Sequence, residues 1–115
     1  FVPRDRLDQL YAESRVFCLM SRCESFGIPA IEAQGFGTPV VSSTAGAIPE
    51  ICGAGGLFRD PDDVAGIAAA LRTLLEDDAE WRRLSVLARE NAGRFTWSEC
   101  SRPLVELVEE MARGR

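Results

Sequence analysis

The stretch ESFGIPAIE, residues 24–32, decides how the rest of this 115-residue chain is arranged. Upstream of it, residues 15–20 (RVFCLM) are mostly apolar without alternation, which is typical of a parallel strand buried on both faces. Downstream, Pro29 suits the first turn of a helix, which we expect over residues 29–36. The order is therefore strand, loop, helix, and ligands of open α/β sheets bind at the carboxyl ends of the strands.

Two carboxylates bracket this loop. Glu24 should lie in the loop and Glu32 within about the first turn of the helix. Their carboxylates should therefore reach the crevice at the carboxyl ends of the strands from different levels. Between them, the amides of Phe26, Gly27 and Ile28 can face an anion, because glycine permits close approach and a helix N-terminus favours negative charge. Backbone amides can bind phosphate, and carboxylates can accept hydrogen bonds from hydroxyls. Such a loop therefore suits a ligand in which a sugar is joined to a nucleotide. On spacing alone, surface glutamates flanking a turn glycine are an equally open alternative.

Composition narrows the class of protein. The length allows one domain at most, and 46% hydrophobic residues can build a core. The net charge of −5 argues against a general nucleic-acid binder or a binder of anionic membranes. No apolar run approaches the length of a membrane span.

The cysteines argue against metal and nucleophilic chemistry. No pair of them has C-x-x-C spacing, and the chain has no histidine, so we expect no zinc site and no Ser-His or Cys-His catalysis within it. Cys18 lies in the apolar run and should behave as a small buried hydrophobe. We expect reduced thiols and a cytoplasmic location. The four cysteines are Cys18, Cys23, Cys52 and Cys100.

Hydrophobic spacing predicts the elements around the loop. A first helix over residues 4–14 should bury Leu7, Leu10 and Tyr11. The loop at residues 43–46 follows the second strand and should face the same crevice as Glu24. We interpret the glycines at residues 53–56 as a plain tight turn. The second strand is expected at residues 38–42, a short helical turn at 48–52 and a third strand at 56–58.

Residues 60–63 (DPDD) contain a D-x-D pattern that could hold a metal, but we interpret it as a helix start. Asp60 would be the N-cap, with Asp62 and Asp63 in the first turn near the positive end of the helix dipole. We therefore expect no metal. The residues spaced for the buried face of this helix are Val64, Ile67, Ala68, Leu71, Leu74 and Leu75.

Two longer helices should follow. The first, over residues 79–92, would turn Trp81, Leu84, Leu87 and Ala88 inward. The second should begin at a capping box formed by residues 96–99. Its broad apolar face consists of Leu104, Val105, Leu107, Val108 and Met111. The count is three short parallel strands, about half of a full doubly wound nucleotide-binding domain, so the fold class is an α/β, Rossmann-like half-domain.

The 24–32 stretch resembles the E-x7-E motif of the "glycosyl transferases group 1" family, retaining nucleotide-sugar enzymes with the GT-B fold. Residues 21–27 (SRCESFG) are similar to the family's S-x-x-E-x-F-G pattern. Residues 32–33 and 37–41 (EA and GTPVV) are similar to its E-A…G-x-P-V-V pattern. The order and spacing hold from about Leu7 to Trp97. The sequence departs from the family at Met20, at Gln34-Gly35 and at Ala47.

The resemblance implies roles for these residues. Glu32 would accept hydrogen bonds from the ribose hydroxyls of the donor, and Glu24 would be the catalytic residue, contacting the donor sugar. The amides of residues 26–28 would hold the sugar and diphosphate. The further donor-binding residues would be Ser25, Thr44 and Gly46. No cofactor and no metal would be needed, since the nucleotide diphosphate sugar is the substrate.

The resemblance also implies what lies outside the chain. Residues 1–115 would be a single partial domain, the C-terminal part of the GT-B donor-binding domain. The start of that domain, with its phosphate-binding Arg and Lys, and the acceptor-binding domain would be missing. The isolated chain should therefore be inactive and should self-associate as a homo-oligomer. It should bind no nucleic acid, and peripheral membrane association would need the missing regions.

Two other functions are alternatives to sugar transfer. An oxidoreductase binding a dinucleotide needs G-x-G-x-x-G after a strand, and the loop after Met20 has no such pattern. A non-catalytic nucleotide- or phosphate-binding module, or a self-associating Rossmann-like module, remains open as the alternative.

Overall fold

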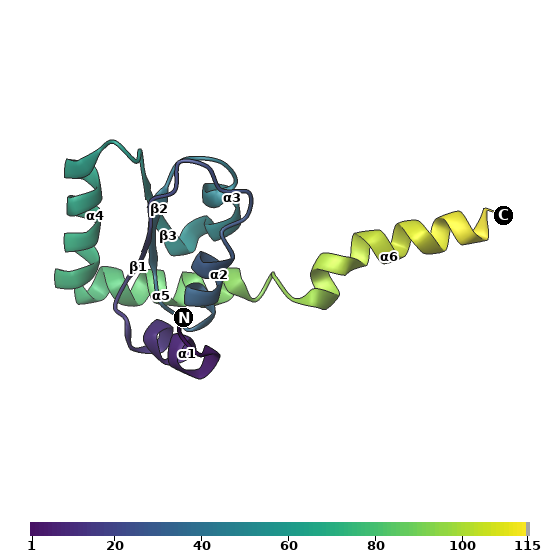
Figure 1. The fold of residues 1–115 in the computed structure, drawn as a ribbon, viewed down its shortest axis with the longest axis horizontal. Coiled ribbons are helices and arrows are strands. Elements are labelled where there is room, and N and C mark those ends of the chain that lie inside the picture. The colour runs from purple at the N-terminus through teal and green to yellow at the C-terminus, as the bar shows by residue number, and fades with distance from the viewer. Residues whose placement is uncertain (115) are drawn as a thin grey trace.

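The computed structural model describes residues 1–114 and contains a three-stranded parallel sheet with helices on both of its faces (Figure 1). The sheet order is β1 (Phe17–Leu19), β2 (Val40–Ser43), β3 (Gly56–Arg59), and both pairings are parallel. The fold class expected from the sequence is confirmed. The helices are α1 (Arg4–Glu13), α2 (Ile28–Gly35), α3 (Ile48–Cys52), the 3₁₀ turn η1 (Gly53–Gly55), α4 (Val64–Glu76), α5 (Asp78–Ala92) and α6 (Trp97–Arg113).

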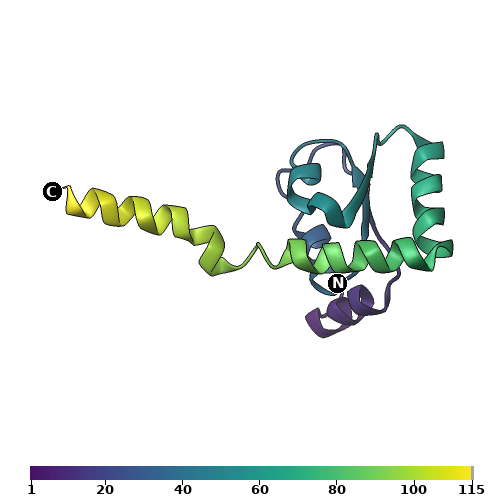
Figure 2. The same ribbon diagram turned by 180° about the vertical axis from the view of Figure 1, so that it is seen from behind.

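The two faces of the sheet carry separate apolar cores, because successive strand residues point to opposite sides. Val40 points towards α2 and α3, where it packs with Ala30 and Ile48. The next residue, Val41, points towards α4 and α5, where it packs with Leu74. Seen from behind in Figure 2, α5 crosses the lower end of the sheet while α4 stands beside it. All four residues of β2 are buried, so the central strand holds the layers together.

The first strand differs from its prediction. We expected residues 15–20 to be buried on both faces, but β1 is only partly buried, and Cys18 is exposed. The reason is position: β1 pairs with β2 alone and forms one edge of the sheet. The expectation that Cys18 is a buried hydrophobe is therefore wrong for this chain. By contrast, burial raises the pKa of the Cys52 thiol to about 11.

The start of α4 also differs from its prediction. Asp63, and not Asp60, is the N-cap, and its Oδ1 accepts the amide of Gly66 at 2.9 Å. Asp60 instead accepts the amide of Asp62 at 2.8 Å and shapes the turn before the helix. The buried face of the helix is also narrower than predicted. Ala70 and Leu74 are buried, with Ile67 and Leu71 packed beside them, whereas Val64, Ala68 and Leu75 are exposed.

The glycines after α3 do more than form a turn. A Cβ on Gly55 would lie 2.5 Å from the Cα of Ala88, so only glycine lets α5 approach η1 this closely. Beside this contact, the fully buried Gln34 donates to the carbonyl of Cys52 at 2.8 Å. Asn91 of α5 donates to Gln34 Oε1 at 2.6 Å and to the carbonyl of Ile51 at 2.8 Å. A polar network thus joins α2, α3 and α5.

The last helix lies apart from the rest of the molecule (Figure 1). As predicted, Thr96 is its N-cap, with Oγ1 accepting the amide of Glu99 at 3.1 Å. None of the residues Trp97–Arg113 is buried. No helix within residues 1–114 is long and apolar enough to cross a membrane.

Candidate functional site

The predicted glutamate loop connects the carboxyl end of β1 to the N-terminus of α2. Glu24 is half-buried, and Ser21 Oγ lies 3.5 Å from its Oε2, at the limit of a hydrogen bond. Gly27 is the N-cap of α2, with φ of 85°, and its carbonyl accepts the amide of Ala30 at 2.9 Å. No side chain within residues 1–114 caps this helix. Its N-terminus is therefore free of a competing side-chain acceptor.

The loop after β2 lies against the loop after β1, as the sequence predicted. The amide of Ala47 donates to the carbonyl of Glu24 at 3.5 Å. A Cβ on Gly46 would lie 2.3 Å from that same carbonyl oxygen, and Gly46 has φ of 61°. Glycine is therefore required for the loops to touch. Thr44 is exposed beside this contact, and its amide extends the pairing with β3 by donating to the carbonyl of Arg59.

Glu32 lies on the second turn of α2, and its carboxylate faces α1. Arg4 Nη1 donates to Glu32 Oε1 at 2.6 Å, and the Tyr11 hydroxyl donates to Oε2 at 3.1 Å. Burial and the bond to Glu32 together raise the pKa of Tyr11 to about 12. Glu24 and Glu32 thus have different partners from different elements.

Sequence analysis missed Arg4 and Tyr11 as neighbours of Glu32. The signal was their spacing, since residues seven apart lie on the same helical face two turns from each other. The sequence predicts Tyr11 on the buried face of the first helix but does not indicate that its hydroxyl contacts Glu32. That contact depends on how α1 packs against α2, a tertiary property.

An apolar groove runs beside Glu32, between α2 and the start of α6. Its volume is about 540 Å³. One wall is the Phe26 ring, which packs edge to face against Phe95 with ring centres 5.5 Å apart. The side chain of Phe26 thus serves packing, and its amide is the group left for a ligand. The groove is lined by Phe26, Ile28, Ile31, Glu32, Phe95, Thr96, Trp97 and Cys100.

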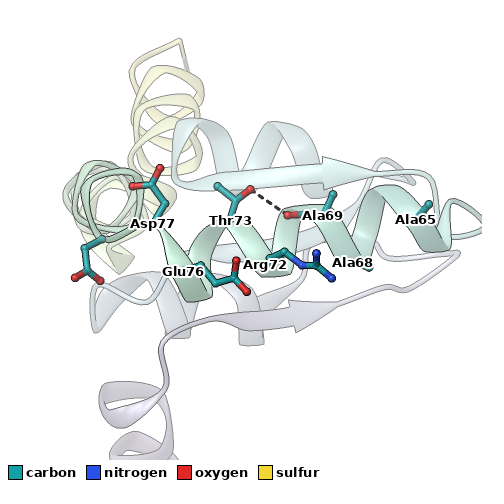
Figure 3. Close-up of a pocket in the computed structure, with 8 residues that line it drawn as sticks. Ala65, Ala68, Ala69, Arg72, Thr73, Glu76 and Asp77 are labelled. Atoms are coloured by element: carbon teal, nitrogen blue, oxygen red, sulfur yellow. Dashed lines mark hydrogen bonds between the residues drawn. The ribbon is translucent and has the colours of Figure 1, made fainter.

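A second hollow, of about 740 Å³, lies on the outer side of α4 and includes neither glutamate of the motif (Figure 3). Two of its polar side chains are engaged within the helices: Thr73 donates to the carbonyl of Ala69 at 3.0 Å, and Asp77 caps α5. Asp78 pairs with Arg15, which holds the pKa of that carboxyl below its usual range. Asp77 and Asp78 of this hollow are thus engaged in contacts within the protein.

The D-x-D pattern is engaged in contacts within the protein. Asp62 forms a two-pronged ion pair with Arg22, which holds the pKa of Asp62 below its usual value. Within residues 1–114, no three of the His, Cys, Asp and Glu side chains lie close enough to hold one metal ion. A metal-independent reaction stays a prediction from the sequence.

Comparison with known proteins identifies the family of this chain. Residues 1–91 match the family described as "Glycosyl transferases group 1". The chain is 39% identical over 102 residues to O-antigen chain mannosyltransferase B of Escherichia coli, covering 88% of this chain and 26% of that protein. It is 35% identical over 113 residues to D-inositol 3-phosphate glycosyltransferase of Corynebacterium kroppenstedtii, covering 96% and 25%. The chain thus spans about a quarter of the length of these relatives.

A solved structure agrees with the sequence match. Sucrose-phosphate synthase from Thermosynechococcus elongatus superposes with a TM-score of 0.86 and 28% sequence identity. The superposition covers 99% of this chain and 29% of that one. Sequence and fold lead to the same conclusion: this chain belongs to the glycosyl transferases group 1 family.

Proposed function

We propose that this chain binds the nucleotide-sugar donor as part of a retaining glycosyltransferase that transfers a sugar to an acceptor. The observation that carries the proposal is the meeting of two loops at the carboxyl ends of neighbouring parallel strands. There the Glu24 carbonyl touches the loop at Gly46, next to the N-terminus of α2, which has no side-chain cap within residues 1–114. In open α/β sheets this edge binds ligands, and a helix N-terminus favours phosphate.

In the proposed roles, the two glutamates bind different parts of the donor. Glu32 would accept the ribose hydroxyls, and Glu24 would contact hydroxyls of the donor sugar as it moves towards the transition state. The amides of residues 26–28, at the start of α2, would stabilise the departing diphosphate. Ser25 and Thr44 are exposed and could donate their hydroxyls to the same donor.

The remaining parts of the proposal concern the whole protein. We propose that the acceptor-binding domain and the first part of the donor-binding domain lie outside residues 1–115, in keeping with the quarter of its relatives' length that the chain spans. The chain alone would then bind donor weakly and not turn over. Metal independence and a cytoplasmic location belong to the same proposal.

The test compares two variants of the full-length enzyme. Glu32→Gln should weaken binding of UDP, GDP or ADP, whichever the enzyme uses, and of the matching nucleotide sugar by about ten- to a hundredfold, because a hydrogen bond to a charged group is worth roughly 1.5–3 kcal/mol. Glu24→Gln should leave nucleotide affinity nearly unchanged but reduce turnover. Glu90→Gln, at an exposed position of α5, is the matched control.

Two results would count against these roles. Equal losses of nucleotide affinity in the two variants would mean that Glu32 and Glu24 do not bind separate parts of the donor as proposed. Unchanged affinity and turnover in both would return Glu24 and Glu32 to ordinary surface carboxylates.

Self-association is the second candidate property, and α6 favours it. Five of its large apolar residues, all C-terminal to Pro103, are 49–62% exposed, and they gather on one face of the helix. We propose that a second copy of this chain covers that face when the rest of the enzyme is absent. The residues involved would be Leu104, Val105, Leu107, Val108 and Met111.

A further inference from the structure

The carboxylate of Glu32 has two partners of opposite character. Arg4 is an exposed cation, with 61% of its side chain accessible, and it also pairs with Asp8 at 2.8 Å. Tyr11 is 5% exposed, and it is the buried residue of α1. One carboxylate oxygen is thus held by a long, solvated side chain and the other by a group fixed in the core.

The ring of Tyr11 is held in place on several sides. It packs edge to face on Phe17 of β1, with centroids 5.7 Å apart, and stacks on Phe36 at 6.1 Å. The backbone carbonyl of Tyr11 accepts a hydrogen bond from the Thr38 hydroxyl at 2.6 Å. A tyrosine anchored in this way presents its hydroxyl from one direction only, so its bond to Glu32 Oε2 orients the carboxylate.

The exposed ion pair between Arg4 and Glu32 is the contact that a ligand can replace. Solvated ion pairs contribute little stability, since they lose side-chain entropy and are screened by salt. An ionised carboxylate offers about four acceptor positions on its two oxygens. A ligand hydroxyl can therefore replace Arg4 at Oε1 while Tyr11 continues to hold Oε2.

We propose that Tyr11 is a positioning residue, which holds the Glu32 carboxylate so that Oε1 accepts the ribose hydroxyls of the donor nucleotide. The inference rests on the proposed role of Glu32 in donor binding. In this arrangement Arg4 covers the carboxylate before the donor binds and competes with the ribose for it. Tyr11 itself does not touch the donor.

The test measures discrimination between ribose and deoxyribose. Binding of UDP, GDP and ADP to the full-length enzyme is compared with binding of their 2′-deoxy forms, in the parent, Tyr11→Phe, Glu32→Gln and Arg4→Gln. Tyr11→Phe keeps the ring and its aromatic contacts but removes the hydroxyl. It should reduce the preference for the ribonucleotide about two- to tenfold, the worth of one ordinary hydrogen bond, and weaken binding of the deoxynucleotide less, because that nucleotide keeps only its 3′-hydroxyl.

The other variants separate this inference from the proposed function. Glu32→Gln should reduce the preference for ribose more strongly than Tyr11→Phe does, and if it leaves the preference intact, the donor-binding role of Glu32 fails. If Glu32→Gln reduces the preference but Tyr11→Phe does not, or weakens both nucleotides equally, the positioning role alone is overturned. Arg4→Gln should tighten ribonucleotide binding, and a loss equal to that of Tyr11→Phe would contradict an exchangeable Arg4.

A second measurement does not depend on ligand binding. Tyr11 is the only tyrosine among the 115 residues, so the tyrosinate absorbance of this chain reports its ionisation alone. The pKa of Tyr11 should be about 12 in the folded chain and should fall in Glu32→Gln, which loses the charged acceptor of its hydrogen bond. An unchanged pKa in Glu32→Gln would show that the two groups are not in contact, which would overturn the proposal.

Discussion

Replacing Asn91 with leucine tests the polar network that fixes α2, from which Glu32 projects, against α5. Asn91 is 8% exposed and donates two hydrogen bonds, to Gln34 Oε1 at 2.6 Å and to the carbonyl of Ile51 at 2.8 Å. Leucine has a similar shape but no donor. Both acceptors would remain buried without a partner from residue 91, and each such group costs about 1–3 kcal/mol.

The expected loss of unfolding free energy is about 2–4 kcal/mol, the lower part of the range for two groups because the surroundings relax. Domains of this size have a total of roughly 6–17 kcal/mol, at about 0.05–0.15 kcal/mol per residue. The loss is therefore large enough to measure by urea denaturation followed by circular dichroism. Glu90→Leu, at the exposed neighbouring position on α5, is the control and should change stability by no more than about 0.5 kcal/mol.

A double-mutant cycle with Gln34→Leu sharpens the test. The double variant removes both partners of the 2.6 Å bond, so its loss should be smaller than the sum of the two single losses by about 1 kcal/mol. Additive losses, or an Asn91→Leu chain as stable as the parent, would refute the argument that the two carboxamides stabilise each other across the helices.

Gly46→Ala should destabilise the chain by at least about 1–2 kcal/mol, the cost of the left-handed conformation, and should also weaken nucleotide binding because its Cβ would push against the Glu24 carbonyl; an alanine variant with parental affinity would contradict the contact between the loops. Leu74→Ala should cost about 2–5 kcal/mol in a denaturant titration, because Leu74 is fully buried between α4 and the sheet. Tyr11 has a folded pKa of about 12 against about 10 when unfolded, so its contribution to stability should be complete below pH of about 10 and lost as the pH rises through about 12; Tyr11→Phe should remove this part of the pH dependence, and alkaline denaturation curves of the two chains would show it. The 115-residue chain should form a dimer or larger species by light scattering, and Leu107→Glu on the exposed face of α6 should shift it to monomer, with Glu106→Gln as the control; a monodisperse parent monomer would be evidence against self-association.

The relation between sequence and fold is clearest at α4. Its apolar residues recur at helical spacing, so the sequence predicted a helix there, and the structure has one. The sequence did not determine which aspartate begins it, since Asp60 and Asp63 both suit an N-cap. The ion pair between Asp62 and Arg22, 40 residues apart, accompanies the turn that delays the start to Val64. A contact of that separation leaves no mark in local spacing.

The same division applies to the candidate site. Local chemistry placed Pro29 in the first turn of α2, and the parallel order of β1 and β2 brought the loops of Glu24 and Gly46 together. Both follow from rules that act along the chain or between successive strands. The contact of Tyr11 with Glu32 depends instead on the packing of α1 against α2, two helices joined through an intervening strand.

The sequence by itself determined the element types, their order and the parallel sheet, because periodicity, capping and turn chemistry act over a few residues. Tertiary structure alone decided that Cys18 of β1 is exposed, since burial depends on what lies beside a strand. It also decided that Gln34 is satisfied by Asn91 and Glu32 by Tyr11 and Arg4. Hydrogen-bond partners 21–57 residues apart are chosen by packing, which aligns donors with acceptors only once the layers have formed.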